Sequence, residues 1–448
     1  MKHPLWKWTL GAFAVLALLD TLRIVLWTYG ADTGTFVQIV LDAFGGMRNG
    51  IEHGTHYRYH WSPALTLLWP VLAATHAALA LQLVQAAATV AVAPLIYALV
   101  APRAGPQLAL RAAILTLIYP PLFAIGWGEF HDVGLWPVLA LGAIVAADRR
   151  QWWWFTACIA IGIGLREDIC IELAIAGVAL GIANWRSRTA WFATTAAAVL
   201  SLAVYYGVVI PRLGGVWLPA HFYVYAFASG PLTLALAPLL HPLAFVQTFF
   251  TFGRLTYLLE AFVPLALLPL RSRWSLLALP GFAIVLLAND GLVYHMGNHY
   301  AALWVPWLLA GTAFAIGRQR SLRWVNAAIG LCIIVLVFFN PLHPTHFLQP
   351  NYHDLASARR ALACVPANAS VATHDEWFSA IAAHNPNATL ATIRDVDYLV
   401  YADDFPNANF AATVIPALRA EVAAGQYHPT CRYGSVITYT RKGIHEPK

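Results

Sequence analysis

Apolar runs long enough to cross a lipid bilayer recur along this chain, and they constrain its fold more than any other feature. A spanning helix needs about 20 mainly apolar residues. The first run extends from Trp8 to about Trp27. Further runs lie near 77–100, 107–126, 134–147, 152–165, 169–183, 189–210, 255–270, 275–289, 299–316 and 325–339. We therefore predict a mainly α-helical, multi-pass membrane protein with about eleven spans, some of them short enough to be tilted or partly inserted.

The scarcity of charge supports this prediction. Only 11% of the 448 residues are charged, against roughly a quarter in soluble domains. A single buried core cannot absorb such a deficit, because cores stop growing at roughly 250–300 residues. The 18 tryptophans suit the headgroup level of a bilayer, where amphipathic rings gather.

The basic residues predict the orientation of the chain. They fall between apolar runs rather than on one face, which argues against a nucleic-acid binder. With the N-terminus in the cytoplasm, most of them lie on the cytoplasmic side, as the positive-inside rule requires. They are Lys2, Lys7, Arg103, Arg111, Arg149, Arg150, Arg186, Arg188, Arg271, Arg273, Arg318, Arg320 and Arg323.

This orientation divides the chain into two domains. Residues 1–340 form the membrane domain, with outward regions at 29–75, 126–133 and 211–253, and with Pro63–Thr75 as a helix in the outer interface. Residues 341–448 remain outside. They alternate strand-like runs (370–373, 398–401, 436–439) with helix-like runs (354–363, 376–383, 411–423), which predicts a small extracytoplasmic α/β domain.

Asp32 follows the first span directly. A carboxylate just above the bilayer can act as a general base on an acceptor hydroxyl or amine. The alternative is a helix N-cap, a position that Asp favours.

Glu129, His131 and Asp132 gather at the end of another span. They suit either a metal site or the positioning of an acceptor, and the alternative is a solvated turn that caps the next helix. The sequence contains no clear metal motif, so it leaves a cofactor open, with a divalent metal as the option.

Charged side chains in a membrane region are costly and are functional candidates for that reason. Arg166, Glu167 and Asp168 lie between two apolar runs. Arginine binds phosphate in a forked geometry, and the two carboxylates could orient it; the alternative is a self-neutralised outer loop. Arg254 opens a span, and it either meets a lipid phosphate or extends to the interface as lipid-facing arginines do. His299 and Tyr300 belong to a polar outer loop.

Five short motifs, in this order, resemble those of a bacterial membrane family called domain of unknown function 2079. They are Asp32-x-Gly34-x-Phe36-x-Gln38, His60-Trp61-Ser62-Pro63, Glu129-Phe130-His131-Asp132, Arg166-Glu167-Asp168, and His299-Tyr300 with Pro306. The family reads approximately D-L-G-I-F-D-Q, H-F-S-P, D-F-H, K-E-D and H-Y. Val37 stands where the family carries a second acid, which puts a two-acid metal site there in doubt.

That family is similar to the GT-C superfamily of integral-membrane glycosyltransferases. The resemblance implies a GT-C-like architecture in the cell's inner membrane, a sugar donor on a polyprenyl phosphate, and a catalytic acid in the first outer loop. Asp32 matches that acid by position, and His60 falls where related enzymes carry an interfacial helix.

The leading hypothesis is a glycosyltransferase that moves a sugar from a polyprenyl-phosphate donor to an acceptor on the outer face. Asp32, Glu129 and Asp132 are its catalytic candidates, and Arg166 and Arg254 its donor-phosphate ligands. His60, His131, Glu167, Asp168, His299 and Tyr300 would support them. The rival hypotheses are a transporter, whose charges should lie at the midplane, and a non-catalytic protein that binds polyprenyl lipids.

Cys364 and Cys431 both lie in the domain predicted outside, where disulfides persist. A bridge between them would join the two ends of that domain, and it requires their Cα atoms to lie within about 7 Å. The alternative is two independent buried thiols. Cys158, Cys170 and Cys332 lie in apolar runs and fit small core residues.

Overall fold

The computed structural model describes residues 4–183, 187–214, 225, 231–339, 347–350, 352–390 and 396–444. Some sequence predictions fall outside these ranges. They are Lys2 and Arg186, parts of the outward region 211–253, and both ends and a few inner residues of the predicted domain 341–448.

The chain forms two compact units, which we describe separately. The first contains residues 1–17, 57–65 and 83–343, and the second contains 18–56, 66–82 and 344–448. The second unit therefore combines much of the segment predicted as the first outer loop with the C-terminal segment.

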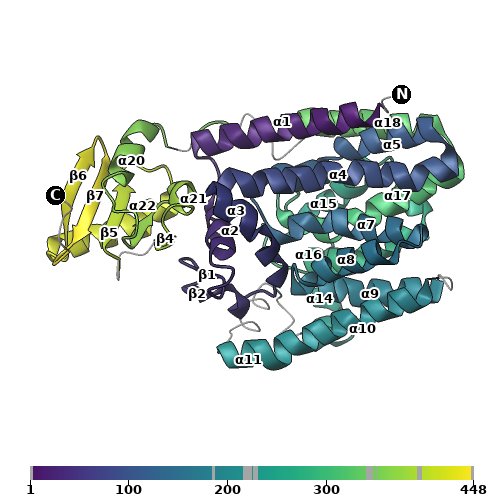
Figure 1. Ribbon diagram of the computed structural model, residues 1–448, viewed down its shortest axis with the longest axis horizontal. Coiled ribbons are helices and arrows are strands. Elements are labelled where there is room, and N and C mark those ends of the chain that lie inside the picture. The colour runs from purple at the N-terminus through teal and green to yellow at the C-terminus, as the bar shows by residue number, and fades with distance from the viewer. Residues whose placement is uncertain are drawn as a thin grey trace. The chain divides into compact units, whose positions relative to one another are not determined.

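The first unit is a bundle of helices of very different lengths (Figure 1). Its described helices are α1 (Leu5–Leu26, of which the first part belongs here), α4 (Ala78–Ala104, from Leu83), α5 (Pro106–Leu117), α6 (Pro120–Trp127), α7 (Trp136–Asp148), α8 (Trp152–Ile163), α9 (Glu167–Ala183), α10 (Arg188–Val204), α11 (Ile210–Leu213), α13 (Pro231–Leu240), α14 (Pro242–Phe249), α15 (Phe252–Phe262), α16 (Leu279–Leu286), α17 (Val305–Gln319) and α18 (Leu322–Phe338).

One continuous apolar core runs through this bundle, from Val92 on α4 to Cys332 on α18. Helices α9 and α10 can pack closely because Gly177 has no side chain. A Cβ at this position would lie 2.6 Å from the Trp191 carbonyl oxygen. Large apolar side chains are also exposed on the outer helices, for example Trp153 at 89%. Apolar surface on both sides of a helix suits a bundle that packs against itself inward and against lipid outward.

The helices that qualify as spans are fewer than the eleven predicted. Among the described residues, Leu5–Leu26, Ala78–Ala104 and Arg188–Leu213 are long and apolar enough to cross a membrane. The bent pair α5 and α6, at an angle of 53°, would make a fourth. Much of the difference is one of length, since Trp152–Ile163, Arg273–Leu286 and Leu322–Phe338 are apolar helices of 10–17 residues. Proline begins α6, where the predicted run 107–126 bends.

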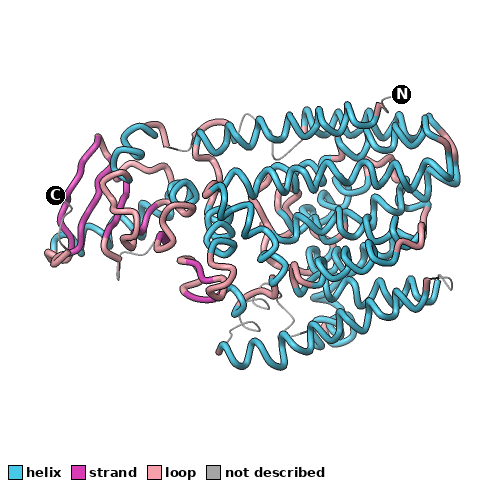
Figure 2. Tube along the Cα trace, viewed as in Figure 1, coloured by secondary structure: helices cyan, strands magenta, loops and turns pink. Residues whose placement is uncertain are grey.

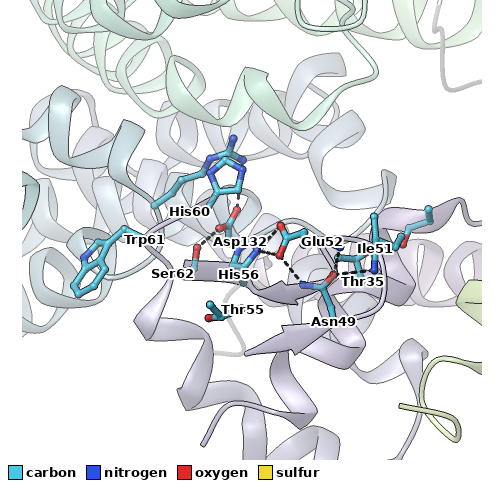
Figure 3. A network of polar contacts seen from close by, with 12 residues as sticks. Thr35, Asn49, Ile51, Glu52, Thr55, His56, His60, Trp61, Ser62 and Asp132 are labelled. Atoms are coloured by element: carbon cyan, nitrogen blue, oxygen red, sulfur yellow. Dashed lines mark hydrogen bonds and ion pairs between the residues drawn. The ribbon is translucent and has the colours of Figure 1, made fainter. Parts of the chain in front are cut away.

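The second unit begins with the end of α1, from Leu18. It continues with α2 (Ala31–Leu41), a short hairpin of β1 (Arg48–Asn49) and β2 (Gly54–Thr55), and α3 (Trp69–Thr75). Glu52 shapes the hairpin by accepting hydrogen bonds from Asn49 Nδ2 (2.6 Å) and His56 Nδ1 (2.8 Å), as Figure 3 shows. The helix predicted over Pro63–Thr75 is present as a 3-10 turn, Pro63–Leu68, followed by α3.

The C-terminal segment of this unit is an α/β fold, and its strands stand out in Figure 2. It contains α20 (Leu355–Leu362), β3 (Val371–Thr373), α21 (Asp375–Ile381), β4 (Ala388–Leu390), β5 (Tyr398–Ala402), α22 (Ala408–Ala423), β6 (Tyr427–Tyr433) and β7 (Val436–Arg441). The sheet order is β4-β3-β5-β7-β6, with β3 parallel to both β4 and β5 and the remaining pairs antiparallel.

The central strand β5 is buried along its whole length, as its unbroken apolar sequence predicts for a strand covered on both faces. The three strands and three helices expected in this segment are all present within a few residues. Strands β4 and β6 were not predicted. Residues Tyr427–Tyr433 carry His428, Pro429 and Arg432, and most of them are not buried, so the strand has no apolar periodicity to reveal it.

A disulfide joins Cys364, after α20, to Cys431 on β6, and their Cα atoms are 6.7 Å apart. This is the pairing that the sequence predicted, within its distance limit. The bridge spans 67 residues, and closing a loop of that length stabilises the folded state by about 4 kcal/mol in the chain-entropy model.

Candidate functional site

Four of the five motif segments meet in the first unit. They are residues 60–62, residues 129–132 at the end of α6, residues 166–168 at the start of α9, and the 3-10 segment His299–Leu303. Each lies at a helix terminus or in a connection, where backbone groups lack intrahelical partners. A cluster of charged and polar side chains results, and we call it the polar cluster.

Glu167 anchors the first of these segments. Its carboxylate lies 2.8 Å from His60 Nδ1 and accepts a hydrogen bond from the Trp61 backbone N–H at 2.8 Å. The residue is 1% exposed, so these partners replace the water that a buried charge would lose.

Asp132 anchors the same segment from another side. It is fully buried, and it accepts hydrogen bonds from the Ser62 hydroxyl (2.7 Å) and the Val133 backbone N–H (2.8 Å). Figure 3 shows Ser62 directed at this carboxylate. Asp132 and Glu167 therefore hold the segment that contains His60, Trp61 and Ser62.

Arg166 supplies the positive charge of the polar cluster. Its guanidinium lies 3.1 Å from Asp168 and 3.8 Å from Asp132, and 5.6 Å from the centre of the Tyr300 ring. The residue is 5% exposed. Two carboxylates thus hold the guanidinium in place, and arginine is a side chain that binds phosphate in a forked geometry.

His131 and His299 stack face to face, with ring centroids 3.3 Å apart, and Tyr300 packs against His299. Gln85, near the start of α4, holds this part of the cluster, and it was not among the predicted site residues. Its side chain accepts from the His131 N–H at 3.0 Å and donates to the carbonyls of Ile125 and Glu129. The signal was an amide within an apolar run, a position where a polar group needs partners.

Arg254, on α15, has a different environment from the one predicted. Its guanidinium donates to the carbonyls of Leu286, at 2.6 Å, and Ala288, and to the Thr251 hydroxyl at 3.0 Å. These bonds tie the start of α15 to the end of α16. The contacts describe a structural arginine, and Arg166 is the better candidate for an anion ligand.

Asp32 belongs to the second unit, in the first turn of α2, and its side chain is exposed. A carboxylate in this position is stabilised by the helix dipole. A second carboxylate close to it comes from Asp375, the first residue of α21. Sequence reasoning could not find this pair, because the two residues lie in segments far apart along the chain.

Asp375 is exposed, yet the pKa of its carboxyl is raised above its usual value. Partial removal from water is the main cause, and the negative charge of Asp32 is the second. Val37, which stands at the position of the family's second acid, is fully buried and serves packing.

The remaining motif residues of α2 attach this helix to the C-terminal segment. Gln38 Nε2 donates to the carbonyls of Asn385, Pro386 and Ala388, while its Oε1 accepts from the Gly50 N–H. Gly34 lies against Phe378, where a Cβ would come within 2.6 Å of the ring. The motif thus predicts a packing surface as well as a site.

A metal site has no support in the described part of the chain. There, no group of three or more His, Cys, Asp and Glu side chains is arranged to hold a metal ion.

A helical unit with exposed apolar faces and a buried polar cluster, accompanied by a small α/β segment, defines an integral membrane protein. The sequence pattern of the predicted membrane proteins called domain of unknown function 2079 matches residues 25–428, and the chain belongs to that family. No curated protein shows significant similarity to the chain.

The fold also resembles that of a solved structure. ArnT from Cupriavidus metallidurans, in a crystal structure with bound undecaprenyl phosphate, superposes with a TM-score of 0.56 at 11% identity. The match covers 97% of this chain and 98% of ArnT. At this identity the likeness concerns the fold, and it agrees with the architecture that the sequence predicted.

Proposed function

We propose that this protein is a GT-C-type glycosyltransferase, which moves a sugar from a polyprenyl-phosphate donor to an acceptor on the outer face of the membrane. The likeness over nearly the whole chain to ArnT, a GT-C glycosyltransferase with bound undecaprenyl phosphate, is the observation that carries the proposal. The family membership and the polar cluster support it.

In this proposal Arg166 binds the donor phosphate. Sugar transfer leaves a lipid phosphate whose negative charge grows as the glycosidic bond breaks, and a preorganised cation stabilises that charge in the transition state. Asp168 and Asp132 keep the guanidinium in place. Arg254 has no part in this step, because its donors already serve backbone carbonyls.

Asp32 acts as the general base, which removes the proton of the acceptor hydroxyl or amine. Its exposure suits this role, since an acceptor has to reach the carboxylate. Asp132 and Glu167 are buried and bonded to the segment 60–62, so we assign them to positioning rather than to proton transfer.

The test is transfer by the purified protein in lipid nanodiscs, offered a panel of polyprenyl-phosphate sugars, with release of the lipid phosphate as the readout. Arg166→Gln should lower turnover by about 10²–10³-fold, as loss of a charge-stabilising donor does elsewhere. Arg166→Lys keeps the positive charge but loses the forked geometry of the guanidinium. Its turnover should lie between that of the wild type and that of Arg166→Gln. Arg212→Gln, at an exposed arginine, is the control and should leave turnover unchanged.

Other outcomes would redirect the proposal. Donor binding without phosphate release, across the panel, would favour a non-catalytic protein that binds polyprenyl lipids. Movement of an unaltered donor between leaflets would favour the transporter.

A further inference from the structure

The hydroxyl of Ser379 interacts with the first turn of α2 in an unusual way. Its oxygen accepts a hydrogen bond from the Gly34 backbone N–H at 3.0 Å, and its own proton goes to the Gly30 carbonyl. These two backbone groups are four residues apart, the pair that an α-helix normally joins directly. Ser379 therefore bridges the opening turn of α2, and Asp32 lies inside that turn.

The surroundings leave Ser379 little freedom. The side chain is 3% exposed, and the residues around it are in close contact. Gly34 has no Cβ, and one built there would lie 2.9 Å from the Ser379 backbone. The absence of a side chain at Gly34 is therefore what lets α21 approach closely enough for the bridge to form.

Two further side chains attach the C-terminal segment to α2 and to the hairpin that follows it, away from Asp32. Gln38 binds carbonyls of residues 385–388, and the Thr389 hydroxyl donates to the Gly50 carbonyl at 2.7 Å. The attachment of the C-terminal segment to α2 does not depend on Ser379 alone, so a variant at Ser379 should remain folded. The hydrogen bonds of Ser379 differ from these bonds in one respect: they constrain the helical turn that carries Asp32.

We infer that Ser379 is a positioning residue for Asp32, and that the C-terminal α/β segment thereby fixes the turn that carries the proposed general base. The inference rests on the proposed function. Its physical basis is that a buried side chain that bonds both an N–H and a carbonyl of one helical turn restricts the geometry of that turn. A displacement of about 1 Å in a reacting group can cost 10²-fold in rate.

The experiment compares Ser379→Ala with Thr389→Val in the full-length protein in nanodiscs. Ser379→Ala removes two hydroxyl bonds to the first turn of α2, whereas Thr389→Val removes one hydroxyl bond to Gly50 in the hairpin that follows α2. Both variants weaken the attachment of the C-terminal segment, and only the first alters the turn of Asp32. We expect Ser379→Ala to lower kcat by about 10–100-fold with KM for the lipid donor unchanged. Thr389→Val should lower the unfolding temperature to a similar degree and leave kcat within about twofold of the wild type.

A second variant separates positioning from packing. Ser379→Cys keeps the volume but offers a weak donor and acceptor, so its kcat should lie between wild type and Ser379→Ala. Equal kcat losses in Ser379→Ala and Thr389→Val would overturn the inference, as would a loss confined to KM. An inactive wild-type protein would instead overturn the proposed function.

Discussion

Carboxylates in the two units have opposite environments. In the first unit Asp132 and Glu167 are buried, and backbone and side-chain donors occupy their oxygens. In the second unit Asp32 is exposed at the start of a helix, and the residues around it, Gly34, Gln38 and Ser379, are the ones that make packing contacts. In the second unit, therefore, Asp32 is accessible to a ligand, whereas the residues that hold its helix in place are buried.

This contrast separates a structural role from a proton-transfer role, which the sequence motifs suggest equally for each acid. A buried carboxylate with several donors keeps the structure in place, and removing it leaves its partners unsatisfied. An exposed carboxylate on a rigid turn can exchange protons with a ligand at little cost to folding. Substitutions at the two kinds of acid should therefore change different quantities.

The largest expected effect is on activity, at Asp32. Asp32→Asn should lower turnover by about 10²–10⁴-fold, the usual contribution of a general base, because the amide cannot take up the proton. The unfolding temperature should stay close to that of the wild type, since the side chain is exposed. Turnover and thermal unfolding of the same preparation test this, and undiminished turnover would move the base to Glu129.

Acid should affect the second unit strongly through His374, which is 2% exposed, stacks on Phe405 and accepts from the Ala402 N–H. Burial lowers its pKa from 6.5 to about 3. As pH falls from 6.5 the unfolded chain binds this proton first, so the free energy of unfolding decreases, by up to about 5 kcal/mol at pH 3.

Hydrogen exchange of β5 between pH 7 and pH 4 measures this loss, with His374→Gln as the comparison. The variant should show a weaker dependence on pH. If wild type and variant lose protection in parallel, His374 is not the group responsible.

Asp132→Asn should lower stability, in contrast to Asp32→Asn. The amide removes the negative charge beside Arg166 and one acceptor of the cluster, and breaking a buried pair costs about 3 kcal/mol or more. Thermal unfolding in detergent checks this. If Asp132→Asn unfolded at the same temperature as the wild type, the proposed difference between the structural Asp132 and the catalytic Asp32 would be wrong.

The smallest effect should come from Asp375. Its pKa is raised in the folded state, so the folded protein binds the proton more readily than the unfolded chain. The free energy of unfolding therefore decreases as pH rises above 3.8 through the folded pKa. Asp375→Asn removes this loss and should stabilise the protein slightly at pH 7, by at most about 0.5 kcal/mol, as is usual at exposed positions.

The gain from Asp375→Asn should disappear near pH 3, where both proteins carry an uncharged group. Unfolding temperatures at pH 3 and pH 7 decide the matter. A gain at both values would indicate a cause other than charge.

Much of this protein could be predicted from its sequence because the relevant signals are local. Apolar runs indicated the helices of the first unit, and alternating strand-like and helix-like runs indicated the α/β segment. Spacing and compartment suggested the bridge between Cys364 and Cys431. Fewer helices than the eleven predicted are long and apolar enough to cross a membrane, because several of the predicted runs form short helices or a bent pair.

The amino-acid sequence by itself determined the membrane class, the helical bundle, the α/β segment and the chemical types gathered in five motifs. Only the tertiary structure decided what each acid and each arginine does. Ser62 meets Asp132 across 70 residues, and Gly34 meets Ser379 across 345. Burial and hydrogen-bond partners control the behaviour of a charge, and both come from segments that only the folded chain brings together.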